Sequence, residues 1–529
     1  MSALPVYSPI QRLDFDVLTC IFGMNADMFD DHRALETTLA TSRVCRDWRS
    51  CILGTTSIWA HLIDFSDRNL RTAKGINELM RRSGISLRWI KVPYLPSFRR
   101  EWAGFILLAV GEDLRRTQKL EVTIGGDHVD LWSQLYHPAP HLKSFGITFT
   151  QEWSKFNNIF SSLFGGSAPM LHELRFKGHR SNFTVRPSWL HQLRSLDLRV
   201  DLTVSEMLEV LMSTSNLVIL RFDKLLANHN HTTLTLLANH TTSTFPFVSL
   251  PKLTHLEIKL HGELNPGALL LDHMCIPPDC SIDISATWTN LAEIDNKSIF
   301  THIIRAISSC ARLHFIHRPP QQLWLTIMPG YFFLQTATHS HGPSFKFGVG
   351  LKSMHVFPTH TLSILLSEFA LPGLSEVTWS RFKITGMNRP IPGFTVFMRS
   401  LPAVRVIGTD KYSLRHLRAW SALKGVDTGP RIGFPALEIL KLDSVLPSHS
   451  YRSKFDSVPD PVSTYVKARI ARGHALSIID CTNDELHVLP DMKFLRKAVG
   501  LKVRWRQRGV AEIREYICGT GPPQKVESV

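Results

Sequence analysis

A hydrophobic template, Leu-x-x-Leu-x-Leu with apolar replacements, recurs along the chain and limits the folds that are open to it. Eight segments match it, with leading residues at Leu142, Leu171, Leu193, Leu217, Leu253, Leu351, Leu374 and Leu437. The first three intervals between them are 29, 22 and 24 residues. A unit of this length holds one short apolar strand and one returning helix. The pattern therefore predicts parallel strands joined by helices.

Proline marks the start of many of these units. It stands two residues before the leading apolar position at Pro140, Pro169, Pro251, Pro372, Pro402 and Pro435. Because proline cannot continue a helix, it ends the returning helix and releases the chain into the next strand. One such helix is legible over 204–212, where Val204, Met207, Leu208 and Leu211 fall at helical spacing.

These periods resemble leucine-rich repeats, and the resemblance implies an irregular α/β solenoid of parallel strands and returning helices over 65–518. Intervals of 98 and 63 residues separate Leu253 from Leu351 and Leu374 from Leu437. Segments 323–327 and 404–406 are candidate strands within them, and 330–350 and 444–460 are interpreted as long loops. A non-repeating α/β domain, with helices on both faces of its sheet, is the alternative.

The carboxyl-terminal region is expected to close the array. A helix is predicted over 465–472, a last strand over 474–479 and a capping helix over 485–499. Residues 502–508 alternate basic and apolar side chains, which is typical of a half-buried strand or a sheet edge. The polar residues 519–529 are predicted to be a disordered tail.

The amino-terminal segment 8–64 has a different pattern. Its apolar side chains recur at offsets 0, 4, 5, 8 and 9, which predicts one stripe of a helix, at Leu13, Val17, Leu18, Ile21 and Phe22. Residues 30–31 are a start signal for a second helix that carries Leu35 and Leu39 and runs on towards Trp48. Residues 62–63 are interpreted as the first short strand of the region beyond this segment.

Three spaced motifs in this segment carry a resemblance. They are Pro9-Ile10-x-x-Leu13-x-x-x-Val17-Leu18-x-x-Ile21-Phe22, then Val44-Cys45-x-x-Trp48, then Ser57-Ile58-Trp59. Together they resemble an F-box of the type found in mushroom-forming fungi, which implies a three-helix F-box over 8–64. One position departs from the family, which usually has proline after the leucine at Leu13. Here Asp14 is the next residue, and aspartate also suits the amino end of a helix.

The resemblance implies a function without catalysis or cofactor. An F-box protein with such repeats is the substrate-receptor subunit of a Skp–cullin–F-box ubiquitin ligase. Its amino-terminal helices bind the Skp adaptor, and through it a cullin, while the repeats hold a target protein. The implied adaptor-binding residues are Pro9, Ile10, Leu13, Val17, Leu18, Ile21, Phe22, Val44, Cys45 and Trp48. Trp59 is interpreted as a core residue.

The charge of the chain leaves a second hypothesis open. Lys and Arg number 60 against 45 acidic residues, a formal net charge of +15 in 529 residues. The basic residues are spread along the chain, whereas a nucleic-acid groove needs a continuous basic stripe with aromatic side chains. The charge is therefore interpreted as a preference for acidic partners. The alternative is a ligase-independent scaffold or basic nucleic-acid-associated protein with a vestigial F-box.

No motif for catalysis stands out. His339 and His341 would supply only half of a metal site, and Cys275 and Cys280 are interpreted as ordinary thiols. Eight cysteines without paired short spacing are typical of a reducing compartment. No apolar run approaches the length of a membrane span and no secretory signal is visible, so a cytoplasmic or nuclear location is expected.

Overall fold

The computed structural model describes residues 13–67, 70, 72–93, 111, 114–124, 134–150, 163–178, 187–226, 245–262, 264–288, 294, 296–338, 342–352, 356–387, 391, 393–422, 433–443, 461–486, 495, 498–507 and 512–520. The chain divides into two compact units. The first unit comprises residues 1–226 with 248–253, and the second comprises 227–247 with 254–529. Both units are mixed α/β with mostly parallel sheets.

The first unit begins with four short helices, here called the helical module. They are α1 (Phe15–Asn25), α2 (Ala34–Thr41), α3 (Arg46–Gly54) and α4 (Thr56–Ala60). Asp14 is the N-cap of α1, and its carboxylate accepts a 2.6 Å hydrogen bond from the Phe15 amide. A short carboxylate at this position satisfies a free amide of the first turn. Asp14, the residue after Leu13, therefore starts the helix.

The predicted continuous second helix is wrong, because residues 42–45 interrupt it. Helix α2 ends at Thr41, and the Ser42 hydroxyl donates back to the carbonyl of Leu39. Cys45 then has extended backbone angles and is the N-cap of α3. Its sulfur accepts a hydrogen bond of 3.5 Å from the amide of Trp48. Polar side chains that bond to nearby backbone groups compete with helix propagation, which explains the break.

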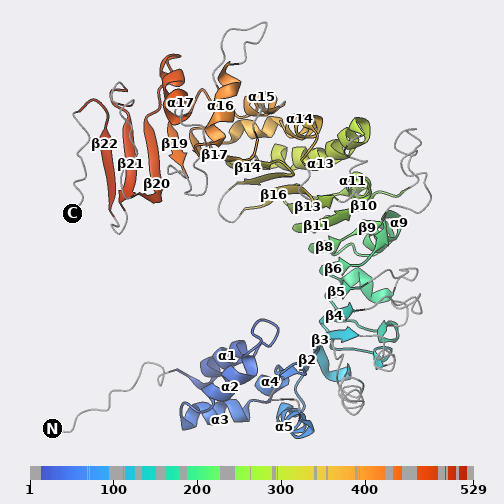
Figure 1. Ribbon diagram of the computed structural model, residues 1–529. Helices are drawn as coiled ribbons and strands as arrows, with labels where there is room; N and C mark the ends of the chain where they lie inside the picture. Colours follow the sequence, from blue (N-terminus) through green and yellow to red (C-terminus); the bar gives the residue numbers. More distant parts are fainter. Residues whose placement is uncertain are drawn as a thin grey trace, which may run out of the picture. The chain divides into compact units, whose positions relative to one another are not determined.

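A parallel sheet comes after the helical module. Its strands pair in chain order, as Figure 1 shows for β3 to β8: β1 (Ile63–Asp64), β2 (Arg88–Val92), β3 (Thr117–Ile124), β4 (Ser144–Phe149), β5 (Glu173–Lys177), β6 (Ser195–Arg199) and β8 (Ile219–Asp223). The connecting elements include α5 (Ala73–Ser83), η3 (Leu114–Arg116), η4 (Leu163–Gly166), η5 (Ser188–Gln192) and α9 (Val204–Met212). Short strands β7 (Leu202–Thr203) and β9 (Leu225–Leu226) pair beside α9, and β10 (Val248–Ser249) completes the unit.

The sequence template is confirmed in this unit. Each leading leucine, for example Leu142, is buried in a tight turn, where its amide donates to the carbonyl three residues earlier; Leu171, Leu193 and Leu217 repeat this bond. The strand begins two residues later. Pro140 and Pro169 each stand four residues before their strand, as the proline pattern requires. Helix α9 is also confirmed, with Thr203 and Glu206 forming a capping box.

A cluster of aromatic and charged side chains fastens the helical module to the sheet. His61, just after α4, stacks on Trp89 of β2 with ring centroids 3.7 Å apart. The ammonium of Lys119, on β3, lies 3.7 Å from the centre of the Trp89 ring and 3.7 Å from the Asp27 carboxylate. Phe29 contacts Trp89 from the loop after α1. Stacking and cation–π contacts of this kind hold the two parts of the unit together.

This cluster makes the stability of the first unit depend on pH. Burial lowers the pKa of His61 to about 4, with Lys119 lowering it further and Asp27 raising it. The unfolded chain takes up a proton near pH 6.5 and the folded chain does not. The free energy of unfolding should therefore fall by about 2 kcal/mol as the pH drops from 6.5 to about 4, a value reduced for partial exposure.

Urea unfolding measured across this pH range checks the prediction. His61→Phe keeps a stacking ring but cannot be protonated, so it should flatten the profile between pH 6.5 and 4. His32→Gln is the control, because His32 is exposed. An unchanged slope in His61→Phe would contradict the assignment.

The second unit is built on a longer sheet. Its strands pair in the order β11 (His255–Gly262), β13 (Ser281–Trp288), β16 (Ser344–Leu351), β15 (Tyr331–Ala337), β14 (Gln322–Met328), β17 (Trp379–Ile384), β18 (Val406–Thr409), β19 (Ile439–Leu442), β20 (Ile478–Leu486), β21 (Lys502–Gln507) and β22 (Ile513–Ile517), with β12 (Met274–Cys275) apart from it. Its helices are α11 (Asn265–Asp272), α13 (Lys297–His317), α14 (Thr359–Glu368), η6 (Pro372–Glu376), α15 (Phe394–Arg399), α16 (Ser413–Ala422) and α17 (Pro461–Ile470). Figure 1 shows α13 to α16 along one side of the strands.

The predicted loop over 330–350 is wrong. Strands β14, β15 and β16 form an antiparallel meander in the middle of the otherwise mostly parallel sheet. Alternate residues of β15, such as Phe332 and Leu334, are buried, as are Phe345 and Phe347 of β16. Glycines at 348 and 350 leave room for the rings of Phe333 and Tyr331 on the opposite face. The many polar and glycine residues of this segment concealed its strand alternation.

Two template matches in this unit are out of register. The strand near Leu351 ends there, and Met354 lies outside the described residues. Leu374 lies in a 3-10 turn, and β17 begins only at Trp379. By contrast, the matches at Leu253 and Leu437 lead into β11 and β19, and the candidate strand at 323–327 is confirmed by β14. The candidate at 404–406 overlaps β18 only at Val406, where that strand begins.

Some of the carboxyl-terminal predictions are also confirmed and others are wrong. Helix α17 and the half-buried strand β21 are confirmed. The predicted last strand over 474–479 is only partly right, because β20 runs from Ile478 to Leu486. It is also not the last strand, since β21 and β22 come after it. Residues 485–486 are therefore strand and not helix. Residues 487–494, most of the predicted tail and the predicted loop over 444–460 lie outside the described residues.

Candidate functional site

Helix α1 leaves one apolar face exposed. Val17, Ile21 and Met24 lie four and three residues apart, so they share one side of the helix, and Leu13 precedes its N-cap. Their exposed fractions are 45% for Val17, 39% for Ile21, 79% for Met24 and 37% for Leu13. We call these four residues the apolar stripe. A run of exposed apolar side chains along one helix face is typical of a surface that another protein covers.

The opposite side of α1 forms the core of the helical module. Leu18 and Phe22 are buried, and Phe22 contacts the ring of Trp48 edge to face, with centroids 5.2 Å apart. Thr19, on the same helix, forms a hydrogen bond with the sulfur of Cys51. The structure therefore separates the five apolar residues that the sequence placed on one stripe. Leu18 and Phe22 hold the helices together, and Leu13, Val17 and Ile21 face outward.

The remaining predicted adaptor-binding residues also differ in how exposed they are. Val44 is 63% exposed in the short link between α2 and α3. Cys45 is exposed and caps α3, and Trp48 is half-buried against Phe22. Pro9 and Ile10 lie outside the described residues. Sequence reasoning missed Met24, although its spacing of three from Ile21 is the signal that would have placed it on the stripe.

Trp59 is a core residue, as its sequence context predicted. Its ring is buried, and its indole nitrogen donates a 2.8 Å hydrogen bond to the carbonyl of Ile52. The guanidinium of Arg82 lies 4.5 Å from the ring centre. These contacts join α3, α4 and α5, so Trp59 fixes the helical module against the next element of the chain.

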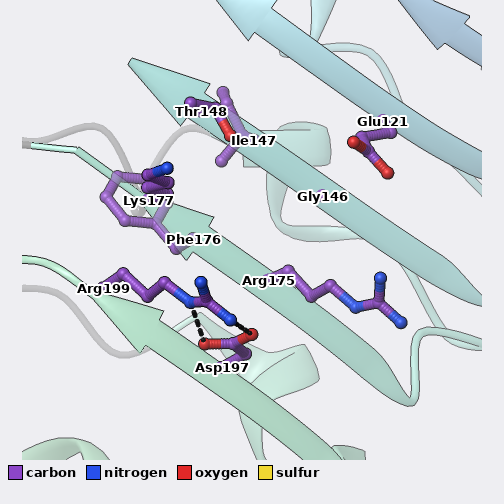
Figure 2. Close-up of a pocket in the computed structure, with 9 residues that line it drawn as sticks. All are labelled: Glu121, Gly146, Ile147, Thr148, Arg175, Phe176, Lys177, Asp197 and Arg199. Atoms are coloured by element: carbon purple, nitrogen blue, oxygen red, sulfur yellow. Dashed lines mark hydrogen bonds and ion pairs between the residues drawn. The ribbon is translucent and has the colours of Figure 1, made fainter. Parts of the chain in front are cut away.

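A second surface feature lies on the sheet of the first unit. A shallow cavity of about 190 Å³ lies across strands β3 to β6. Figure 2 shows the residues that line it: Glu121, Gly146, Ile147, Thr148, Arg175, Phe176, Lys177, Asp197 and Arg199. Strand register places Glu121, Gly146, Arg175 and Asp197 in one row across the four strands. Gly146 has no side chain, so the backbone forms the floor of the cavity at this point.

The described residues give little support for a reactive thiol or for a metal site. Burial raises the pKa of Cys280 and of Cys310 to about 12, so both thiols stay protonated at neutral pH. No group of three or more potential metal ligands comes together among the residues that the structure describes. His339 and His341 lie outside them. Within the same residues, no helix has the length and apolar character needed to cross a bilayer.

No family model matches the chain, and no curated protein sequence matches it. Functional inference therefore has to be made from the exposed surfaces described above.

Proposed function

We propose that this chain is the substrate-receptor subunit of a Skp–cullin–F-box ubiquitin ligase. The observation that carries the proposal is the apolar stripe of Leu13, Val17, Ile21 and Met24 along one face of the helical module. When a partner removes apolar side chains from water, the complex is stabilised by about 25 cal/mol per Å² of apolar surface buried. The stripe lies where the F-box resemblance implies adaptor binding.

The proposal assigns different roles to the two sides of α1. Leu18 and Phe22 position the helix through contacts with α3, while Val17 and Ile21 contact the Skp adaptor directly. Val44 extends the contact surface. Buried aliphatic anchors at an interface centre usually carry most of its binding energy. The chain itself would supply no catalytic residue, and ubiquitin transfer would depend on proximity.

The parallel sheets support the second half of the proposal. In the main sheet of the first unit, strands β3, β4, β5, β6 and β8 pair in chain order, and short helical elements connect them. We interpret this arrangement as an irregular leucine-rich-repeat solenoid whose exposed strand face holds the target protein. Repeat proteins commonly bind partners on such extended surfaces.

The arrangement of charge favours a protein target over nucleic acid. Cations on the exposed strand faces are repeatedly paired with carboxylates, including Lys91 with Asp64, Arg199 with Asp197, Lys346 with Asp283 and Lys441 with Asp480. A groove for nucleic acid needs cations that remain available to phosphates along a continuous path. Paired charges of alternating sign are better suited to contacts with individual side chains of a protein than to a row of phosphates.

A pull-down of purified Skp adaptor by the full-length chain tests the proposal. Val17→Asp combined with Ile21→Asp puts two charges on the stripe without entering the core, so binding should fall at least about 100-fold. Leu313→Asp combined with Ile316→Asp is the matched control, because both side chains are exposed on α13 of the other unit. The control should bind like the wild type.

Two results would overturn the proposal. The first is a wild-type chain that is folded by circular dichroism and yet retains no adaptor. The second is a Val17→Asp/Ile21→Asp variant that retains adaptor as well as the control does. Either result removes the apolar stripe as an adaptor-binding surface.

A further inference from the structure

The cavity on the first unit's sheet contains two cations that no carboxylate of the described residues neutralises. Arg175 and Lys177 are exposed on β5, and neither makes an ion pair or side-chain hydrogen bond with any residue that the structure describes. By contrast, Arg199 on the next strand binds Asp197 through two hydrogen bonds, of 3.1 and 3.2 Å. Figure 2 shows Arg175 and Lys177 extending to opposite sides of the cavity.

The neighbouring strand β4 has no side chain in register with Arg175, because Gly146 stands there. Gly146 lies between Glu121 and Arg175 in strand register, and a Cβ added there would approach Glu121 to 3.3 Å. Thr148 offers a hydroxyl next to Lys177. An extended segment of another protein that lies on these strands could therefore place a side chain between the charged groups that line the cavity.

We propose that this cavity binds a carboxylate side chain of an extended, acidic segment of a target protein. The proposal rests on the receptor function proposed above and names the chemistry of the target. Three cations and two carboxylates line the cavity, which leaves one net positive charge. A carboxylate, with one negative charge, matches that excess. A dianionic phosphoryl group would exceed it and would face Glu121 and Asp197 at close range.

Fluorescence anisotropy with the full-length chain tests this inference. The probe is a short labelled peptide of alternating Glu and Ser, which places its carboxylates on one side of an extended chain. A Gln–Ser peptide and a peptide with phosphoserine in place of Glu are compared with it. The wild type should prefer the Glu–Ser peptide, and Arg175→Glu with Lys177→Glu should weaken that binding about tenfold or more.

The matched control has the same charge change on residues that do not line the cavity. Lys297→Glu with Arg312→Glu alters two exposed cations on α13, and its affinity should stay within about twofold of the wild type, as expected if general electrostatic attraction contributes little. If the charge-reversal variant loses structure, Arg175→Gln with Lys177→Gln replaces it.

Three outcomes would overturn the inference. The wild type could bind the Glu–Ser and Gln–Ser peptides equally, or the cavity variant could bind like the control. A tighter, cavity-dependent affinity for the phosphoserine peptide would overturn the assignment to carboxylate. Adaptor binding is measured separately and should survive Arg175→Glu/Lys177→Glu, so a failed cavity is distinguishable from a failed receptor function.

Discussion

Arg469→Met should lower the free energy of unfolding of the second unit by about 3 kcal/mol or more. The Arg469 side chain is 2% exposed at the end of α17, and its guanidinium donates to four backbone carbonyls. They belong to His474, Gly433, Phe434 and Leu437, at 3.1, 2.8, 3.1 and 3.5 Å. Methionine fills much of the volume but leaves these acceptors without a donor. The turn that leads into β19 would then lose its cross-link to α17.

Urea unfolding followed by circular dichroism measures this effect. Arg312→Met is the matched control, since Arg312 is exposed on α13, and it should change the stability by less than about 0.5 kcal/mol. Equal stabilities of the two variants would show that the buried guanidinium contributes nothing net. Arg469→Lys should recover little, because an ammonium group cannot reproduce the planar set of donors.

Phe22→Ala should destabilise the helical module by about 3 to 5 kcal/mol. Phe22 is buried, and its ring contacts Trp48 edge to face, so alanine leaves a cavity and removes the aromatic contact. Val17→Ala, on the exposed side of the same helix, should change stability by less than about 1 kcal/mol. Thermal unfolding followed by tryptophan fluorescence separates the two.

The same two variants separate folding from adaptor binding. Under conditions where both are folded, Phe22→Ala should keep most of its adaptor affinity, and Val17→Ala should lose part of it. The reverse order would mean that Phe22, and not the exposed stripe, contacts the adaptor. Stability and affinity have to be measured on the same preparations, since a partly unfolded variant also captures less adaptor.

Strands β4, β5, β6 and β8 of the first unit could be predicted because each one repeats a simple local signal. A leucine in a tight turn, followed by alternating buried residues such as Phe145 and Ile147, is enough to place a strand within two residues. The meander of the second unit could not be placed in this way. Its strands pair antiparallel with neighbours that the template does not anticipate. The glycines at 330, 342, 348 and 350 and the polar residues at 338–341 favour a loop locally. Long-range pairing decided the structure there.

The candidate site was predicted only in part, for a geometric reason. The apolar residues of α1 cover a wide arc of the helix, and periodicity does not say which part of that arc neighbouring helices will cover. Leu18 and Phe22 are buried, with the Phe22 ring against Trp48 of α3, while Val17 and Ile21 stay exposed. The cavity around Arg175 and Lys177 had no sequence signal, because its members come from four strands and are brought together by strand register.

The position of the meander also affects the order in which the second unit can form. Strand β13 pairs with β16, whose residues come 63 positions later in the chain, while β14 pairs with β17 on the other side of the meander. A purely sequential sheet could add one strand at a time as the chain leaves the ribosome. Here β13 has to wait until Ser344–Leu351 has been synthesised, so the segment 322–351 joins the sheet as a single block. Nascent chains that end within this segment would expose an unpaired strand edge to chaperones and to aggregation.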